Sequence, residues 1–525
     1  MFNLFSFQKQ KTIQIPVHEV PLGLPKQVKS LCPECKKIIT AEILEENGKV
    51  IMKKECKEHG PFIDIIYSDV NLYLRNERLT FEDAKGIQNP ISEGKLCPMD
   101  CGLCSQHKSY SCLTNIDLTN RCNLKCPICF ANANVKGYVY ELNKKQIREM
   151  LINIIKQNQP QQTHNVQFSG GEPTIHPDFF YALKTAKELG FVQIQIATNG
   201  IKLADLDFLK KAKEAGLTAV YLQFDGFDRE AYINTRGVDL REIKNKAIEN
   251  CRKLDIGVCL VPTIVKTIND KEVGKIVRFA LENADVIHGI SFQPVAFTGR
   301  ISTKERLKLR YTLSDLAYDV ERQTGVALAY DFYPLSMSYP ITKLFSYLLR
   351  KQTINITCHS NCGIGTYILV NIEDRSIKPM SVMNFLDFVP MMFEINNIMS
   401  KAKDTKFSRY ITLKRVTHTM KKYFVEERAP PGFTVKDFIE GLLVEATLKD
   451  KRETPWRLVF VAGMHFQDTY NYNIDRVQRC VIHYSAPNGR IYPFCTYNTG
   501  PTFREEIEKQ FSIPLDEYRA KNIGS

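Results

Sequence analysis

Two features that would place a protein in a membrane or outside the cell are missing from this sequence. No stretch supplies the roughly 18 consecutive apolar residues that a membrane-spanning helix needs. Residues 1–16 lack the long apolar core and the small-residue cleavage site of a signal peptide. We therefore expect a cytoplasmic protein, whose contact with a membrane, if any, is peripheral.

The sequence also lacks a strong excess of charge. It has 71 Lys and Arg against 58 Asp and Glu, a formal net charge of +13 over 525 residues, and its charged and aromatic fractions of 25% and 10% are ordinary. These values exclude wholesale disorder, and at roughly 100–200 residues per domain the length suggests two to four domains. No basic motif is interleaved with aromatic residues, so we expect no nucleic-acid partner.

Cysteine, by contrast, is abundant: the chain has 16, and they are unevenly spread. In reducing cytosol, clustered thiols more often bind metals than pair as disulfides. The pattern therefore predicts a protein with several metal sites. Cys251 and Cys259 stand apart from the clusters, and we expect both to pack as small hydrophobic side chains.

Strand-like and helix-like segments alternate between residues 113 and 300. This alternation predicts parallel βαβ units and therefore an α/β fold, a partial or full β/α barrel whose functional groups gather at the carboxyl ends of the strands. A doubly wound open sheet is the alternative. The expected strands are 113–119, 164–168, 191–197, 218–224, 256–264 and 286–293. The expected helices between them are 143–158, 178–189, 203–215, 238–254 and 270–283.

Cys122, Cys126 and Cys129 form a C-x3-C-x2-C motif directly after the first expected strand, and Phe130 follows it. Soft thiolates at this spacing can hold a cubane iron–sulfur cluster. Three ligands leave one iron open, much as a catalytic zinc site keeps one position for its substrate. On the cysteines alone, a zinc knuckle with a fourth ligand from elsewhere is the alternative.

Glycine and polar residues recur where the other strands end. Glycine allows the backbone to approach a ligand closely, and a carboxylate can accept an ammonium group. The strand ends therefore favour a nucleotide-like ligand. The segments are Ser169–Gly170–Gly171–Glu172–Pro173, Thr198–Asn199–Gly200, Asp225–Gly226 followed by Arg236, and Gln293–Pro294–Val295.

The order of these motifs resembles that of the radical S-adenosylmethionine (SAM) superfamily, over about residues 113–300. The resemblance implies a partial (β/α)6 barrel in which Cys122, Cys126 and Cys129 hold a [4Fe-4S] cluster, with SAM chelating its open iron. Reductive cleavage of SAM would give a 5′-deoxyadenosyl radical that abstracts hydrogen from an unactivated carbon. Gln223 stands where many relatives carry serine. The residues that match SAM-binding positions are Phe130, Gly170, Gly171, Glu172, Thr198, Asn199, Asp225, Arg236 and Gln293.

Three further groups predict metal sites in the parts that flank the barrel, residues 1–112 and 301–525. The first group has the paired knuckles of a single zinc or rubredoxin-like iron ion. Each of the others offers four thiolates for an auxiliary [4Fe-4S] cluster, which makes three clusters in all. A rubredoxin-type knuckle is the alternative for the second group, and two free cysteines beside a zinc hairpin for the third. The groups are Cys32, Cys35, Cys56 and His59; Cys97, Cys101, Cys104 and Cys112; and Cys358, Cys362, Cys480 and Cys495.

The C-terminal part is rich in apolar residues at 332–349 and 380–399 and in Lys and Arg at 401–428. We expect an apolar tunnel and a basic surface that faces anionic phospholipid, with core packing and a solvated helix face as the alternatives. The layout of the whole chain resembles the archaeal tetraether lipid synthase group. That resemblance implies an enzyme that joins the terminal methyl carbons of isoprenoid chains in archaeal diether lipids at a membrane surface, with a ferredoxin-like electron donor.

Three other functions fit the same motifs. A radical SAM enzyme with auxiliary clusters can modify a peptide, or can act on a nucleotide as in molybdenum-cofactor biosynthesis. A zinc-rich interaction scaffold without catalytic activity is the third, and zinc at all four sites without iron would indicate it.

Overall fold

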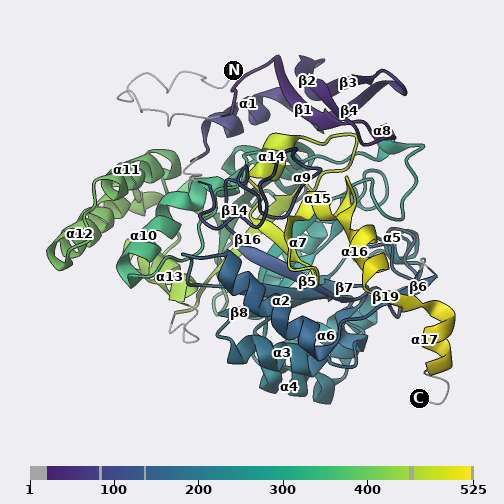
Figure 1. Cartoon of the computed structure of the whole chain (residues 1–525). Helices are drawn as coiled ribbons and strands as arrows, with labels where there is room; N and C mark the ends of the chain where they lie inside the picture. The colour runs from purple at the N-terminus through teal and green to yellow at the C-terminus, as the bar shows by residue number, and fades with distance from the viewer. Residues whose placement is uncertain (1–19, 82–85, 135–136, 448–453, 522–525) are drawn as a thin grey trace.

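The computed structural model describes residues 20–81, 86–134, 137–447 and 454–521. Residues 1–16, in which we expect no signal peptide, lie outside these ranges. No helix within them is both long enough and apolar enough to cross a bilayer. The N-terminal sheet lies at the top of Figure 1, the β/α region fills the centre and bottom, and a group of helices projects to the left.

The N-terminal part forms a four-stranded antiparallel sheet followed by helix α1 (Val70–Arg78). Its strands alternate buried and exposed residues, and Ala41 and Ile43 point to the buried side. Both knuckles of the first cysteine group lie where strands of this sheet end. The strands are β1 (Lys26–Leu31), β2 (Ile38–Glu46), β3 (Lys49–Cys56) and β4 (Gly60–Tyr67).

The six expected parallel strands are present and adjacent in the predicted order, which confirms the predicted α/β fold. The expected helices cover their outer face (Figure 1). Helix α5 (Arg229–Arg236) was not predicted. The strands are β5 (Leu113–Thr119), β7 (Asn165–Gly170), β8 (Gln193–Thr198), β9 (Ala219–Gln223), β10 (Gly257–Val261) and β12 (Ile287–Pro294). The helices are α2 (Lys144–Gln157), α3 (Phe179–Glu188), α4 (Leu206–Ala215), α6 (Arg241–Lys253) and α7 (Val273–Glu282).

Residues 301–525 add strands to both edges of this sheet. Strand β16 (Trp456–Met464) pairs in parallel with β12, and β17 (Ile482–Ser485) pairs in parallel with β5. Strands β14 (Gly363–Asn371) and β18 (Ile491–Pro493) continue the edges in antiparallel sense. The resulting 13-stranded sheet ends at β13 (Tyr333–Pro334) and β18, which do not pair with each other in the described part of the chain. The barrel is therefore partial, and the C-terminal part helps to build its wall.

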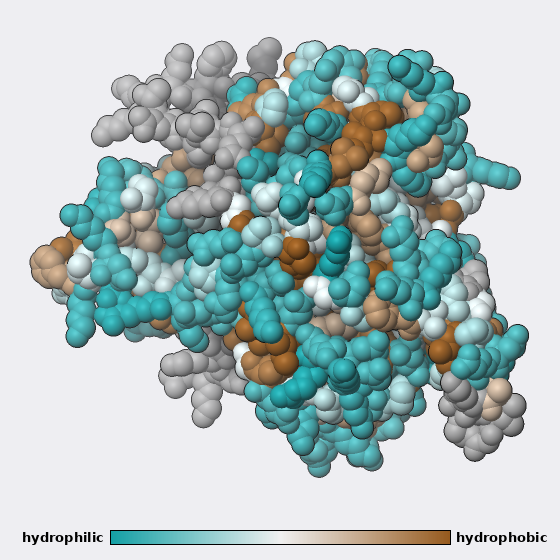
Figure 2. All heavy atoms as spheres, viewed as in Figure 1, coloured by the Kyte–Doolittle hydropathy of each residue, from teal (hydrophilic) through white to brown (hydrophobic). Residues whose placement is uncertain are grey.

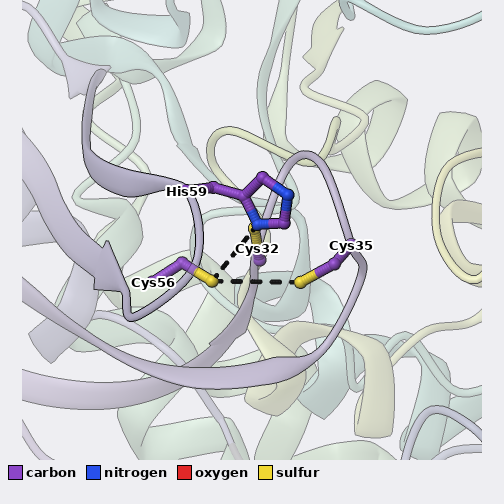
Figure 3. Close-up of side chains that lie close together, drawn as sticks. All are labelled: Cys32, Cys35, Cys56 and His59. Carbon is purple, nitrogen blue, oxygen red and sulfur yellow. Dashed lines mark hydrogen bonds between the residues drawn. The ribbon is translucent and has the colours of Figure 1, made fainter.

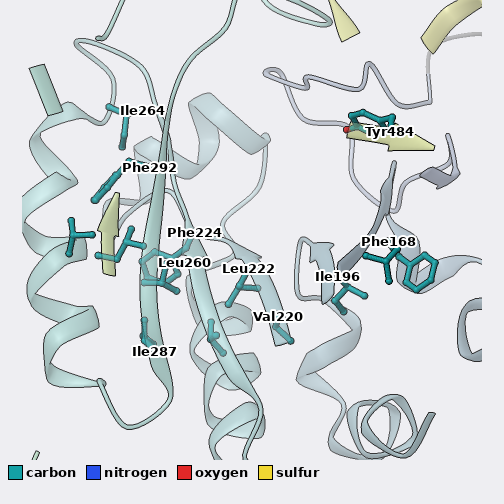
Figure 4. Packing of buried hydrophobic residues seen from close by; sticks show 14 of the residues in the cluster. Phe168, Ile196, Val220, Leu222, Phe224, Leu260, Ile264, Ile287, Phe292 and Tyr484 are labelled. Atoms are coloured by element: carbon teal, nitrogen blue, oxygen red, sulfur yellow. The ribbon is translucent and has the colours of Figure 1, made fainter. Parts of the chain in front are cut away.

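The main core lies between the parallel strands and the helices outside them. Phe168, Ile196, Leu222 and Leu260 are fully buried there on neighbouring strands (Figure 4). Burying a side chain of this size contributes roughly 1.5–3 kcal/mol. Because side chains alternate along a strand, residues such as Gln167 point to the opposite, inner side of the sheet.

A second core lies among the helices that project from the barrel, α10 (Tyr339–Leu349), α11 (Phe388–Ser400), α12 (Lys406–Tyr423) and α13 (Val435–Thr447). Its buried members come mostly from the two apolar stretches at 332–349 and 380–399, as the core-packing alternative predicts. The basic segment forms α12, on which Phe407 is 74% exposed. Figure 2 shows a small hydrophobic area at the far end of this helical group, surrounded by hydrophilic surface.

A buried ionic network joins the N-terminal sheet to the rest of the molecule. Arg310 is fully buried and donates to Asp64 on β4 and, at 2.7 Å, to Asp468. Asp468 also accepts a 2.9 Å hydrogen bond from the Phe297 amide, just beyond the end of β12. Burial opposes ionisation of Asp468, but Arg310 outweighs it and lowers the pKa of Asp468 to about 2. Because every charge in the network is paired, the network holds the N-terminal sheet in one position against the barrel.

Candidate functional site

The loop after β5 carries the cysteine triplet, and other segments hold it from two sides. Asn134 accepts from the Cys122 amide at 2.9 Å and donates to the carbonyl oxygens of Cys122 and Leu124 at 2.8 and 3.0 Å. Cys129 exchanges two backbone hydrogen bonds with Arg300, at 3.1 and 2.9 Å. Burial raises the pKa of the Cys122 thiol to about 12. A metal that binds this thiol as thiolate must therefore displace its proton.

Gly170 and Gly171 lie against the backbone of the triplet loop. A β-carbon on Gly170, whose φ is 121°, would lie 2.2 Å from the Thr119 carbonyl oxygen. A β-carbon on Gly171 would lie 2.0 Å from the Arg121 carbonyl oxygen. The Gly171 amide also donates to Thr119 at 2.7 Å. Any larger residue would push the triplet loop away from β7, so the motif requires glycine at both positions.

Glu172 connects the glycine motif to the loop after β8. The residue is 1% exposed, and its Oε1 accepts from the Thr174 and Thr198 hydroxyls at 2.6 and 2.7 Å. Its Oε2 accepts from the Asn199 amide at 2.8 Å. Burial raises the pKa of Glu172, and these hydrogen bonds offset part of that rise. The carboxylate therefore fixes the backbone of both predicted SAM-binding segments.

Asp225 and Arg236 form a bidentate ion pair, with Nε–Oδ2 and Nη2–Oδ1 distances of 2.5 and 3.0 Å. Arg236 also donates to the Ile128 carbonyl oxygen in the triplet loop at 3.3 Å. Burial disfavours the charged guanidinium, but the carboxylate outweighs it and raises the pKa of Arg236. The pair therefore ties the end of β9 to the triplet loop through α5.

Gln223 and Lys244 extend the hydrogen-bond network of the Asp225–Arg236 ion pair. Gln223 donates to Asp225 at 2.5 Å and accepts from Lys244 at 2.7 Å. Lys244 also donates to the Asn199 carbonyl oxygen. Burial lowers the pKa of Lys244 to about 7. The Gln223 side chain therefore reaches from Asp225 to α6.

These elements surround a cavity of about 480 Å³ at the carboxyl ends of the parallel strands. Asp225 lies just outside its lining, paired with Arg236. The structure thus gathers residues that the sequence spreads over more than a hundred positions. The predicted residues that line the cavity are Cys122, Cys126, Cys129, Phe130, Gly170, Gly171, Glu172, Thr198, Asn199, Arg236 and Gln293.

The cavity also has lining residues that sequence reasoning missed. Tyr221 and Ser291 lie on barrel strands and share a 2.8 Å hydrogen bond. Cys259, which we expected to pack as a small hydrophobic side chain, lines the cavity as well. The period of two along the strands could have identified these positions. Phe466 and Phe494 come from the C-terminal part, where no motif marks them.

The first cysteine group forms a compact site in the N-terminal sheet (Figure 3). One donor atom from each of Cys32, Cys35, Cys56 and His59 lies within 4.8 Å of all the others. The His59 Nδ1 is 3.7 Å from the Cys32 Sγ and 3.5 Å from the Cys56 Sγ. Its hydrogen bond lowers the pKa of Cys56 to about 6. Three sulfurs and one nitrogen in this arrangement fit a tetrahedral ion such as zinc.

The other two cysteine groups lie in one region. The Cys112 amide donates to the Val481 carbonyl oxygen at 2.7 Å, and the Cys112 thiol donates to the Asn355 carbonyl oxygen at 3.2 Å. The two segments that carry the groups are therefore directly joined. The Gln467 amide donates to the Cys495 sulfur at 3.4 Å.

The thiols of these two cysteine groups raise one another's pKa values. Burial raises the pKa of Cys101, and the thiols of Cys97, Cys104 and Cys480 raise it further. Burial also raises the pKa of Cys358, and the thiols of Cys362, Cys112 and Cys480 raise it further. The electrostatic influence of Cys480 therefore reaches both groups, and that of Cys112 reaches Cys358. Which ligands belong to which auxiliary cluster stays a prediction.

Two family profiles match parts of the chain: the radical SAM superfamily over residues 116–280 and the HMPTM N-terminal zinc ribbon domain over residues 24–68. The chain is 44% identical over 511 residues to the 7,8-dihydro-6-hydroxymethylpterin dimethyltransferase of Methanocaldococcus jannaschii, covering 95% of this chain and 98% of that protein. It is 27% identical over 287 residues to the GTP 3′,8-cyclase of Clostridium acetobutylicum, covering 51% of this chain and 88% of that protein.

Solved structures are more distant. The crystal structure of Streptococcus suis SuiB bound to S-adenosylmethionine aligns with a TM-score of 0.33 and 16% identity, covering 66% of this chain and 76% of that one. At that TM-score the likeness carries no argument about function.

The full-length relative contradicts the function that we expected. It is named as a pterin dimethyltransferase, so the resemblance to tetraether lipid synthases, the isoprenoid ether lipid substrate and the coupling of methyl carbons are not supported. A membrane surface as partner is likewise not supported. The structure gives a physical reason why the two apolar stretches do not form a lipid tunnel. Residues 332–349 and 380–399 are fully described, and they pack into the second core without contributing to the lining of the cavity.

Proposed function

The chain belongs to the radical SAM superfamily and is a radical SAM enzyme, and on that basis we propose that it methylates a reduced pterin related to 7,8-dihydro-6-hydroxymethylpterin. The observation that carries the proposal is the 44% identity over 98% of a relative named for that activity. The cavity supports it, because its mixture of aromatic and polar walls suits a planar heterocycle.

Membership of the superfamily implies a [4Fe-4S] cluster and SAM, and the residues at the site fit both. Cys122, Cys126 and Cys129 supply soft thiolate ligands on one short loop. When bound, the cluster and SAM supply radical chemistry at unactivated carbon atoms. Gly170 and Gly171 let β7 approach the triplet loop closely, and both residues line the cavity in which SAM would lie.

The charged residues position this machinery. Glu172 fixes the segments at Thr174 and Thr198, while Arg236 connects the triplet loop to Asp225. Arg236 is paired with Asp225, and the Glu172 carboxylate accepts hydrogen bonds from Thr174, Thr198 and Asn199, so each can hold its neighbours in place without reorganising when a ligand binds.

We further propose zinc for the site formed by Cys32, Cys35, Cys56 and His59, since its donors suit zinc and the zinc ribbon profile covers them. The cysteine groups at 97–112 and at 358, 362, 480 and 495 are proposed to hold two auxiliary [4Fe-4S] clusters. Metal analysis of anaerobically purified protein tests both assignments: about twelve iron atoms and one zinc per chain are expected for three cubane clusters and one ion. Four zinc ions without iron would contradict them.

The substrate is tested with the reconstituted, full-length enzyme. Isotopically labelled 7,8-dihydro-6-hydroxymethylpterin is incubated with SAM and a one-electron reductant, and the small-molecule fraction of a cell extract is added as a source of methyl donors. Mass spectrometry should show one or two methyl groups on the labelled pterin and 5′-deoxyadenosine formation that depends on the pterin. An unchanged pterin, with the same 5′-deoxyadenosine yield in its absence, would contradict the proposal.

A further inference from the structure

Part of the inner wall of the cavity is built from amide side chains. Asn115 on β5 pairs with Gln167 on β7, and Gln167 pairs with Gln195 on β8, so the three residues lie side by side at one level of the barrel. Gln195 donates to Gln167, and Gln167 donates to Asn115, both at 2.6 Å. Asn115 then donates to the His483 carbonyl oxygen at 3.1 Å. We refer to Asn115, Gln167 and Gln195 as the amide ladder.

The amide ladder is unusual for this position. The interior of a β/α barrel is ordinarily filled with branched apolar side chains, and a buried amide lowers stability unless it is hydrogen-bonded. Asn115 is fully buried, and Gln167 and Gln195 are each 7% exposed. Apolar residues would fill the same space with a smaller loss of folding free energy. The amides therefore indicate a role besides packing.

The ladder uses only half of the hydrogen-bonding capacity of Gln167. A carboxamide has two N–H donors and two oxygen lone pairs, and the ladder occupies one of each. Gln167 also lines the cavity. It can therefore offer one donor and one acceptor, side by side, to a molecule bound there.

Another part of the cavity wall is aromatic. Phe466 and Phe494 stack with their ring centroids 3.9 Å apart and their planes at 23°, and the Phe130 ring lies 5.5 Å from Phe494. All three residues line the cavity. Aromatic faces favour a flat, conjugated ring system, whereas the amide ladder favours a polar edge on the same molecule.

We propose that Gln167, held in place by Asn115 and Gln195, determines substrate specificity by recognising the lactam edge of a planar heterocycle, that is, adjacent ring N–H and C=O groups. The proposal rests on the proposed function, in which the substrate is a reduced pterin with such an edge. Gln167 donates its second N–H to the lactam oxygen and accepts the lactam N–H on its own oxygen. A molecule without this edge leaves buried polar groups unpaired and is rejected.

The first test removes the amide. In the reconstituted holoenzyme with SAM bound, Gln167→Leu should weaken binding of 7,8-dihydro-6-hydroxymethylpterin about tenfold or more in equilibrium dialysis, with SAM binding unchanged. The matched control is Asn250→Leu. It removes a buried amide of α6 that donates to the carbonyl oxygens of Leu203 and Ala204, away from the cavity, and should leave pterin binding unchanged. Pterin affinity of Gln167→Leu within about twofold of wild type would overturn the inference.

The second test changes the ligand, so it does not depend on the folding of a variant. Wild-type enzyme should bind the 2,4-diamino counterpart of the pterin, which lacks the lactam edge, about tenfold more weakly or worse. Gln167→Glu should shift the preference toward the diamino compound, because a carboxylate accepts from its amino group. Equal binding of both compounds by wild type, or no shift in the variant, would overturn the inference.

The two proposals fail in different ways. If wild type methylates the pterin but neither test shows discrimination, only the role of the amide ladder is wrong. If wild type neither binds nor methylates the pterin, the proposed function is wrong, and the ladder assignment is overturned with it.

Discussion

The N-terminal sheet and the barrel hold their sulfur ligands in different ways. In the sheet, Cys32, Cys35, Cys56 and His59 come from two turns, and their donor atoms already lie within 4.8 Å of one another. In the barrel, Asn134 holds the triplet from within the same loop, and the distant Arg236 and Arg300 hold it from outside. The difference shows that a closed structural site can be built from local turns, whereas a site that leaves an iron open depends on distant elements.

The largest expected effect comes from breaking the barrel site itself. Cys126→Ser replaces a soft thiolate with a hard, neutral hydroxyl, which does not hold iron of a cluster. We expect complete loss of 5′-deoxyadenosine formation and loss of one cluster's iron, with the zinc of the N-terminal site retained. Iron analysis and chromatography of the products measure both. Cys251→Ser, on α6 and outside every predicted metal group, is the control; wild-type activity in Cys126→Ser would contradict the assignment.

The next effect concerns the support of the triplet loop. Arg236→Ala leaves Asp225, which has no exposed side-chain surface, without its counter-charge, and breaking a buried pair in this way costs about 3–5 kcal/mol. We expect a clearly lower thermal unfolding midpoint together with weaker SAM binding. Arg236→Lys should restore part of the stability, because it returns the charge without the bidentate geometry. An unchanged midpoint in Arg236→Ala would show that distant residues do not support the loop.

The N-terminal site should respond more locally. Cys56→Ser is expected to abolish zinc binding while the iron content and 5′-deoxyadenosine formation stay near those of wild type. Asp64 and Arg310 continue to hold the sheet against the barrel without the metal, since they form a separate buried ion pair. Metal analysis and product analysis of the same preparation test this, with Lys57→Ser on the exposed turn as control. Simultaneous loss of iron would show that the two sites are not independent.

The sequence predicts the local part of this arrangement well. Residues 113–119 are a strand as expected, and the six parallel strands follow in order, because βαβ units are specified by short-range alternation of polar and apolar residues. The paired knuckles at Cys32 and Cys56 are likewise visible from spacing alone. Gly170 and Gly171 were expected to let the backbone approach a ligand, whereas in the structure they let β7 approach the triplet loop.

The remaining features depend on contacts between distant segments. Nothing in residues 456–485 signals that β16 and β17 join the two edges of the barrel sheet, because pairing of strands so far apart is decided by tertiary packing. The Glu172 contacts with Thr198 and the placement of Phe466 in the cavity are hidden for the same reason. The apolar residues at 380–399 suggested a lipid tunnel, since composition does not distinguish a tunnel from a core.

The last prediction concerns a pH dependence on the barrel side. Lys244 joins Asn199 to Gln223 from α6, and burial lowers its pKa to about 7 from the ordinary 10.5. Between these two values the unfolded chain binds more protons than the folded chain, so this residue makes stability rise with pH, by at most about 1.4 kcal/mol per unit. Its unfavourable contribution is largest below pH 7 and disappears above the pKa of the unfolded chain.

Lys244→Met removes that titration together with two hydrogen bonds of the site. The difference in unfolding midpoint between variant and wild type should therefore change steadily from pH 7 to pH 10, with the variant relatively more stable at the lower pH. Lys246→Met, on the exposed side of the same helix, should show no such dependence. If the difference in unfolding midpoint stays constant with pH, Lys244 is charged throughout this range. The barrel site would then tolerate a buried cation as readily as the N-terminal sheet tolerates the paired Arg310.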